Sequence, residues 1–239
     1  MKSKIFSFLL LLSLNSFSQE KTKLKIGLKL GINFSAFTNK AQMLTTFDAM
    51  GYNDFESYFR GSIAVGLVGE YNLSNRLNVG TELLYNSRGN AYRRENNSVL
   101  SLNSNGGRQQ AYDYYIFKLD YLELPIMINY KFLNGSSTYL SAYGGVAPGI
   151  LVSSNVSLKY PTITSGPGNG QPNRDQSLHG VNKLNISPLI GVQVGSQQLG
   201  KTTFYLDLRG SYGIVPVFKN NIGFDTRMVT GTFGLGLKF

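Results

Sequence analysis

Apolar residues recur at every second position in eight segments of this chain. In the first segment, for example, Leu28, Leu30 and Ile32 alternate with Lys29 and Gly31. The eight segments cover residues 24–34, 62–71, 77–86, 122–132, 139–150, 184–194, 204–212 and 229–239. Alternation with a period of two is typical of β-strands that have one apolar and one polar face. The sequence therefore predicts an all-β chain with eight principal strands.

All the charges within these segments lie on the interleaved face, and the apolar face carries none. The charged residues are Lys25, Lys29, Glu70, Glu82, Glu123, Lys131, Asp207, Arg209 and Lys238. A lysine or arginine that faces lipid costs roughly 2–4 kcal/mol at the bilayer midplane. Each segment is close to the roughly 9 to 11 residues that cross a bilayer as a tilted strand, and an open sheet edge cannot be satisfied in hydrocarbon. We therefore predict an eight-stranded antiparallel up-and-down transmembrane β-barrel.

Alternation alone does not show which face points inward, because a soluble barrel of the lipocalin type keeps its apolar residues inside. Three further features favour the membrane barrel. The interleaved face combines glycines with charges of both signs, which suits a narrow lumen filled by side chains. Short and long connections alternate, and aromatic residues mark the strand ends, as in outer-membrane barrels. The short connections are 73–76, 133–137 and 197–201; the long ones are 35–60, 87–117, 153–181 and 214–227; and the aromatic residues are Phe34, Tyr71, Tyr85, Tyr130, Phe132, Tyr212 and Phe239.

The segment 1–18 has the layout of a secretory signal peptide. Two lysines precede an apolar run, and Ser16 and Ser18 occupy positions −3 and −1 of a cut before Gln19. The apolar run is shorter than the roughly 20 residues of a membrane-spanning helix. We therefore expect export and an outer-membrane barrel domain over 19–239. With an even number of strands, both termini of the chain should face the periplasm and the four long connections should face the exterior.

Composition restricts the chemistry of the chain. The absence of cysteine excludes disulfides, thiolate metal sites, cysteine nucleophiles and a lipidated N-terminal cysteine. The formal charge of +10 comes from scattered basic residues, so we expect contact with anionic lipid headgroups and no binding of nucleic acid. We predict no metal, no cofactor and no catalytic residue, and outer-membrane lipids are the expected partners.

Five stretches of the chain carry strand motifs that occur together in one group of proteins. They are Gly27-Leu28-Lys29-Leu30-Gly31-Ile32-Asn33-Phe34-Ser35, Glu82-Leu83-Leu84-Tyr85, Tyr121-Leu122-Glu123-Leu124-Pro125, Asp207-Leu208-Arg209-Gly210-Ser211-Tyr212 and Gly234-Leu235-Gly236-Leu237-Lys238-Phe239. With these motifs the chain resembles the outer-membrane β-barrel families of Bacteroidetes that are called porin-like or PorT-like. The resemblance implies a barrel over the whole mature chain. One branch of the group looks like a component of a gliding or type IX secretion apparatus, which makes secretion-system proteins candidate partners, but no motif here singles out that branch.

Phe239 ends the apolar series of the last strand. A terminal aromatic residue in this position looks like the C-terminal signal that the barrel assembly machinery recognises. The alternative is a final strand that merely ends in an aromatic residue. Because the last strand must close the barrel, we favour the assembly signal and expect the assembly machinery to be a partner during biogenesis.

The inward charges have two interpretations: they line an ion path, or they form a network that plugs the lumen. The interior of an eight-stranded barrel is just wide enough for side chains, and a buried charge without a partner is costly, so we favour the plug. Its predicted members are Lys25, Lys29, Glu70, Glu82, Glu123, Lys131, Asp207 and Arg209. Glu82 and Glu123 lie on neighbouring predicted strands and should repel unless a cation lies between them. Arg209 or a lysine of the first strand could reach across to supply it, and we expect Glu82, Glu123 and Arg209 to form a network.

His179, the only histidine, lies in a long connection close to Asp175 and Ser177. Serine, histidine and aspartate serve acyl transfer, but a triad needs a fixed geometry that closeness in sequence does not supply, so we expect no catalysis. The expected role is non-enzymatic: outer-membrane structure, surface interaction or secretion assembly. The leading alternative is a small pore or transporter for ions or solutes, followed by a soluble lipocalin-like binder and a lipid-modifying enzyme.

Overall fold

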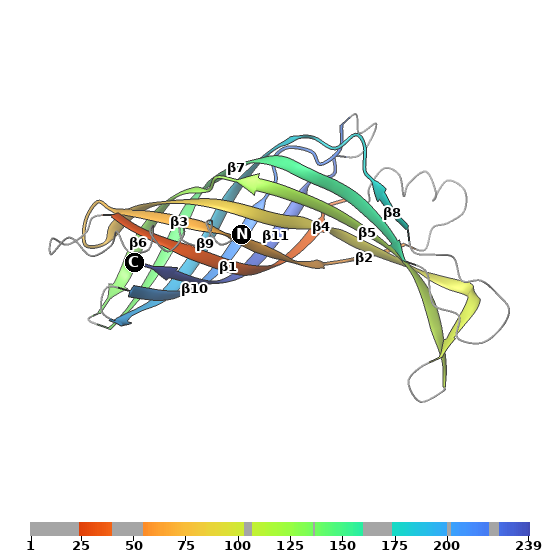
Figure 1. The fold of residues 1–239 in the computed structure, drawn as a ribbon, viewed down its shortest axis with the longest axis horizontal. Helices are drawn as coiled ribbons and strands as arrows, with labels where there is room; N and C mark the ends of the chain where they lie inside the picture. The colour runs from red at the N-terminus through yellow and green to blue at the C-terminus, as the bar shows by residue number, and fades with distance from the viewer. Residues whose placement is uncertain are drawn as a thin grey trace, which may run out of the picture.

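The computed structural model describes residues 24–39, 55–102, 107–135, 137–159, 174–199, 202–219 and 225–239. The predicted signal peptide over 1–18 lies outside these ranges. No helix that is long and apolar enough to cross a membrane occurs within them. The strands, labelled in Figure 1, are β1 (Leu24–Phe37), β2 (Glu56–Tyr58), β3 (Arg60–Asn72), β4 (Leu77–Leu102), β5 (Arg108–Glu123), β6 (Ile126–Asn134), β7 (Thr138–Lys159), β8 (Arg174–Ser177), β9 (Leu184–Leu199), β10 (Thr202–Tyr212) and β11 (Met228–Lys238).

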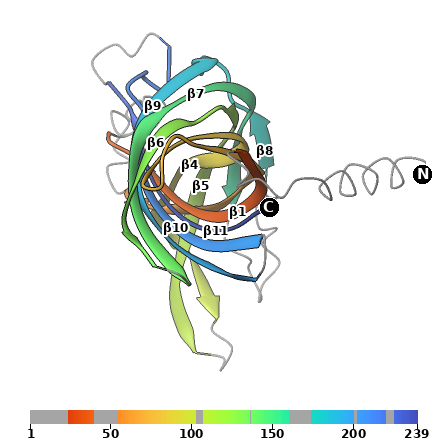
Figure 2. The ribbon, with the colours of Figure 1, turned by 90° about the vertical axis from the view of Figure 1, so that its left-hand side faces the viewer.

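The strands close into a ring in which every pairing is antiparallel. Starting from β1, the hydrogen-bonded order is β3, β4, the consecutive strands β5 and β6, then β7, β9, β10 and β11, which pairs with β1 again. Figure 2 looks down the barrel axis and shows the strands arranged as a ring around the lumen. Because β5 and β6 form one span, the described ring contains eight spans, and the predicted eight-stranded antiparallel barrel is confirmed.

A proline causes the break between β5 and β6. Pro125 lacks a backbone N–H and so cannot donate to the ladder. Its carbonyl still accepts from the Glu82 amide at 3.0 Å, and the Leu124 amide donates to the Pro148 carbonyl at 2.9 Å. The span therefore remains joined to both neighbours across the interruption.

The apolar face of each span points away from the lumen. On β1, Leu28 and Leu30 are 47% and 57% exposed, whereas Lys29 between them is buried. Ile128 on β6 and Ile190 on β9 are likewise exposed. Exposed side chains of this kind form a continuous apolar band around the barrel, with the polar side chains enclosed.

The two ends of the barrel differ. At the end where β11 finishes, the turn over 73–76 is closed by Leu73 and Ser74 amides that donate to the Leu77 carbonyl. We call this the turn end, and the opposite end the loop end. In Figure 1 the β4–β5 hairpin projects well past the barrel at the loop end, and the C-terminus lies near the turn end.

Two predicted long connections are wrong over much of their length. Most of 87–117 belongs to β4 and β5, which stay paired from Glu123 out to Arg108. Much of 153–181 belongs to β7 and to β8, which pairs with β7. Beyond the lipid boundary water replaces hydrocarbon outside the sheet, so the outer face no longer has to be apolar, and the alternation that identifies a strand fades.

The barrel interior changes character near the loop end. There it contains an apolar cluster, with the Arg94–Asp113 ion pair beside it, and we call the apolar set the outer apolar cluster. Its buried members are Phe37, Phe55, Tyr92, Phe117, Leu119, Tyr121, Val156, Val181, Val217 and Met228. The Phe117 ring lies 5.7 Å from that of Phe37 and 6.2 Å from that of Phe218. Strands and connections together thus fill this end with packed aromatic and aliphatic side chains.

Candidate functional site in the barrel lumen

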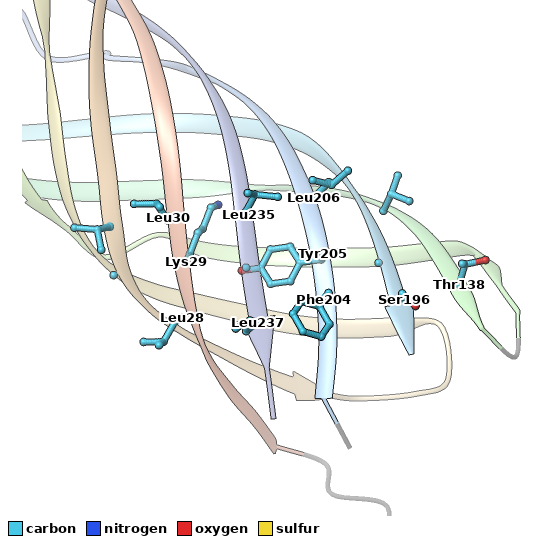
Figure 3. A pocket seen from close by; sticks show the side chains of 15 residues that line it. Leu28, Lys29, Leu30, Thr138, Ser196, Phe204, Tyr205, Leu206, Leu235 and Leu237 are labelled. Carbon is cyan, nitrogen blue, oxygen red and sulfur yellow. The ribbon is translucent and has the colours of Figure 1, made fainter. Parts of the chain in front are cut away.

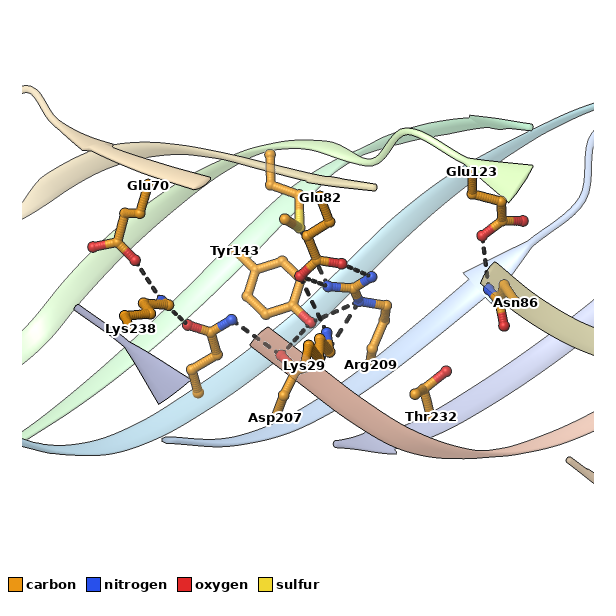
Figure 4. Close-up of polar contacts among 12 residues, drawn as sticks. Lys29, Glu70, Glu82, Asn86, Glu123, Tyr143, Asp207, Arg209, Thr232 and Lys238 are labelled. Atoms are coloured by element: carbon orange, nitrogen blue, oxygen red, sulfur yellow. Dashed lines mark hydrogen bonds and ion pairs between the residues drawn. The ribbon is translucent and has the colours of Figure 1, made fainter. Parts of the chain in front are cut away.

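Four charged side chains meet in the middle of the lumen, and we call them the central group (Figure 4). Lys29 of β1 lies 2.6 Å from Asp207 Oδ2 and 3.2 Å from Glu82 Oε1, measured from its Nζ. Arg209 of β10 binds Glu82 of β4 through two parallel hydrogen bonds of 2.8 Å. The side chains of Lys29, Glu82 and Asp207 are fully shielded from solvent. Two cations and two carboxylates therefore balance across a narrow lumen.

Tyr143 of β7 joins the central group. Its hydroxyl donates to Asp207 Oδ1 at 2.7 Å and accepts from Arg209 Nε at 3.0 Å. Gln193 of β9 also donates to Asp207, at 3.2 Å. Hydrogen bonds to the remaining lone pairs are what a buried ion pair requires to offset its desolvation. The sequence places Tyr143 on the interleaved face, but its role had not been predicted.

A second group lies closer to the loop end and differs from the prediction. Glu123 does not share Arg209 with Glu82. Instead Arg88 Nη2 binds Glu123 Oε2 at 2.8 Å, and the Asn86 side-chain amide donates to the same oxygen at 2.7 Å. Arg88 was not predicted as a lumen residue, because the range 87–117 was assigned to a long connection. In the structure it continues the inward alternation of Glu82 and Asn86 along β4.

The second group continues across the lumen through neutral side chains. The Asn33 amide donates to Asn86 Oδ1 at 2.6 Å, and Thr232 donates to Asn33 Oδ1 at 2.7 Å. Asn33 and Thr232 are paired neighbours on β1 and β11. A chain of hydrogen bonds thus leads from the closing seam of the barrel to Glu123.

A third group lies at the turn end. Glu70 of β3 forms ion pairs with Lys238 of β11 and, at 3.7 Å, with Lys131 of β6. The Asn78 amide donates to Glu70 at 2.9 Å. Lys25 of β1 donates instead to the Thr203 hydroxyl at 3.2 Å. Gln193 joins this group to the central group, because it accepts from Lys238 at 3.3 Å and donates to Asp207. All eight predicted lumen residues therefore point inward, in three charge groups of which two are linked through a neutral side chain.

Three inward tyrosines lie flat over glycines of the neighbouring strand. Tyr139 faces Gly195, Tyr143 faces Gly191 and Tyr205 faces Gly236 in the strand register. A Cβ atom on any of these glycines would come within 2.3 Å of the opposite ring. A lumen cation lies on each ring as well: Lys131 Nζ at 5.4 Å from the Tyr139 ring centre, Arg209 Cζ at 5.4 Å from that of Tyr143, and Lys238 Nζ at 4.3 Å from that of Tyr205. Each stack of glycine, tyrosine and cation therefore fills part of the narrow interior of the eight-stranded barrel.

Of the three residues considered for a triad, Asp175 and Ser177 lie two residues apart on β8, and His179 follows that strand. Asp175 accepts a hydrogen bond from Ser157 of the adjacent β7. Asp175, Ser177 and His179 are all exposed. Within the described ranges no group of three metal-ligating side chains is present either.

Phe239 lies at the seam between the first and last spans. Its side chain is 42% exposed on the apolar band. Its amide donates to the Ile26 carbonyl at 2.8 Å. The terminal residue thus extends the pairing of β11 with β1 to the end of the chain.

A concavity of about 760 Å³ lies on the sheet of β1, β11, β10 and β9 near the turn end (Figure 3). Its outward lining is apolar and includes Leu28, Leu30, Phe204, Leu206 and Leu235. These side chains belong to the apolar band. The concavity is therefore part of the surface predicted to face lipid, and its exposed lining is almost entirely apolar.

Comparison with known proteins gives one family. A family model described as outer membrane protein beta-barrel domain matches residues 17–219. No curated protein matches the chain.

Several solved structures are similar at low identity. Ail, the attachment invasion locus protein of Yersinia pestis, solved with the heparin analogue sucrose octasulfate, is 11% identical over 91% of this chain and 100% of that one, with a TM-score of 0.38. Neisserial surface protein A is 12% identical over 90% and 97%, with a TM-score of 0.40. The outer membrane protease OmpT from Escherichia coli is 12% identical over 94% and 99%, with a TM-score of 0.41. We draw no functional conclusion from likenesses of this size.

Proposed function

The chain belongs to the family of outer membrane protein beta-barrel domains and is located in the outer membrane. From this premise we propose that it is a non-enzymatic, non-conducting barrel that anchors an extracellular sheet and loops for contact with partners. The placement among PorT-like proteins of Bacteroidetes, and with it a role in a secretion assembly, is the narrower form of this proposal and rests on the strand motifs alone.

The closure of the lumen carries the proposal. In the middle, Arg209 and Lys29 bind Glu82 and Asp207 from different walls of the barrel. At the loop end, the outer apolar cluster occupies the interior. An ion would have to separate buried charge pairs and then pass through packed aromatic side chains, and both steps are costly in a low-dielectric interior.

The projecting sheet supports surface interaction. Beyond the barrel, the Arg93 guanidinium lies 4.3 Å from the centre of the Tyr58 ring and 4.7 Å from that of Tyr112. Arg93 also binds Glu56 at 2.8 Å. Exposed aromatic and arginine side chains are enriched at protein interfaces. The non-enzymatic part of the proposal is supported by the exposure of Asp175, Ser177 and His179, because a triad needs a fixed geometry.

Planar-bilayer recording tests the closed lumen. We expect the purified wild-type protein to give no large, steady single-channel current, because the central ion pairs and the packed outer apolar cluster occupy the lumen. A porin inserted into the same bilayer provides the positive control. Steady currents of porin size would reject the plug and favour the alternative of a small pore, for which the lysines at the turn end would be the selective element.

The absence of native cysteine allows the orientation to be tested by single-cysteine labelling. Gln176 on β8 is exposed at the loop end, and Asn75 is exposed in a tight turn at the turn end. We expect a membrane-impermeant maleimide to label Gln176→Cys in intact cells and Asn75→Cys only after the outer membrane is permeabilised. The opposite pattern would show that the barrel is inserted the other way round.

A further inference from the structure

The three groups of lumen charges are not equally balanced. The central group has two cations and two carboxylates, and the second group pairs Arg88 with Glu123. At the turn end, however, the three lysines Lys25, Lys131 and Lys238 are accompanied by a single carboxylate, Glu70. Among the described lumen residues, the entire positive excess therefore lies at the end that we assign to the periplasm.

Two of the three ammonium groups, those of Lys131 and Lys238, share the Glu70 carboxylate. Lys25 interacts electrostatically with Glu70, Lys131 and Lys238. Lys238 occupies one Glu70 oxygen directly, whereas Lys131 lies 3.7 Å from the other. The hydrogen bond of Lys25 goes to the neutral Thr203 hydroxyl. One carboxylate cannot neutralise three cations, so like charges remain facing one another in a narrow space.

Access to this space is one-sided. Lys25 is only half-buried and Lys131 retains some solvent contact, so water reaches the group from the turn end. From the loop end, the central group and the outer apolar cluster separate it from solvent. A compensating ion would therefore enter and leave through the turn end.

We propose that the turn end of the lumen is a binding site for an oxyanion, with Lys25 and Lys131 as its principal ligands and Lys238 beside them. A lysine ammonium is a compact charge with three hydrogen-bond donors, and a phosphate or sulfate oxygen accepts from it. The Thr203 hydroxyl adds a neutral donor. The phosphate chemistry is shared by two sources, free inorganic phosphate in the periplasm and the phosphate of a lipid headgroup at the barrel rim.

The first test uses inorganic phosphate as the probe. The full-length mature protein is unfolded by heat in a zwitterionic detergent while phosphate is titrated against chloride at constant ionic strength. We expect a saturable rise in Tm for the wild type, because a ligand of the folded state stabilises that state. Lys25→Gln should weaken the apparent Kd about tenfold, the effect of losing about 1.4 kcal/mol of binding, whereas Lys25→Arg should retain binding.

The control is Lys183→Gln, which removes an exposed lysine at the loop end and should leave the Kd unchanged. Circular dichroism checks that each variant is folded, so that a failed fold is not mistaken for lost binding. The proposal is overturned if the wild type shows no saturable response, or if Lys25→Gln and Lys183→Gln bind phosphate equally well.

Nanodiscs distinguish the two sources of phosphate. The same titration is repeated in phosphatidylcholine and in phosphatidylglycerol bilayers. Binding that persists equally in both lipids supports a free anion as the ligand. Binding that is lost only in phosphatidylglycerol supports the same site with an anionic headgroup as its occupant. Neither outcome depends on conductance, so failure of this site and failure of the closed lumen are separable.

Discussion

Replacing Arg209 by methionine is expected to lower the free energy of unfolding by about 3–5 kcal/mol, the usual loss when one partner of a buried ion pair is removed. Arg209 supplies two of the hydrogen bonds to Glu82 and one to Tyr143. Without it, Lys29 alone would face two buried carboxylates. Urea unfolding in lipid vesicles measures the loss. Circular dichroism is the readout, because the chain contains no tryptophan for fluorescence.

The matched control is Arg93→Met, on the projecting sheet. Arg93 also pairs with a glutamate and lies on tyrosine rings, but its pair with Glu56 is exposed. The expected loss is much smaller than at Arg209, because solvent screens an exposed pair. A double variant, Arg209→Met with Glu82→Leu, should recover part of the stability, because an apolar replacement of a whole buried pair is often neutral. Equal losses at Arg209 and Arg93 would show that the central group is not a structural element.

Leu30→Arg should be the most damaging change on the outer surface, with a loss of roughly 2–4 kcal/mol and a low yield of assembled protein. Leu30 is 57% exposed and lies between Leu235 and Val65 on the neighbouring strands, in the middle of the apolar band. An arginine there must sit in hydrocarbon. The folded fraction in vesicles and the unfolding free energy report the effect.

Leu24→Arg is the control on the same face of the same strand. Leu24 begins β1 at the turn end, where the side chain can reach the interface and the cost falls to roughly 0–1 kcal/mol. Equal tolerance of arginine at the two positions would mean that the outward face does not contact lipid.

The sequence was sufficient for the membrane-facing part of the fold, and lipid is the physical reason. Hydrocarbon forces one face of every span to be uncharged, so the positions of Lys29, Glu82 and Asp207 on the other face could be inferred from alternation alone. The same logic failed for Arg88, because the outer face of β4 leaves the apolar band at about this level and the pattern fades although the strand continues.

The partners of the lumen charges could not be inferred in the same way. Whether Glu123 meets Arg209 or Arg88 depends on how far the spans are staggered around the barrel, which is a property of the closed ring and not of any single strand. The outer apolar cluster was missed for a related reason. It combines side chains from five spans and three connections that only closure brings together.

The tyrosines that cover glycines also bear on how the barrel finds its register. Tyr139 and Tyr143 are four residues apart on β7, and so are their glycine partners on β9. A slip of two residues keeps every side chain on its proper face, so the alternation of polar and apolar residues does not oppose it. In one direction, however, the slip would place these rings opposite Gln193 and Leu189, and in the other it would place Tyr143 opposite Gln193, so that a side chain would stand where a glycine now leaves space. The paired glycines therefore favour the observed register of β7 with β9 over a register shifted by two residues.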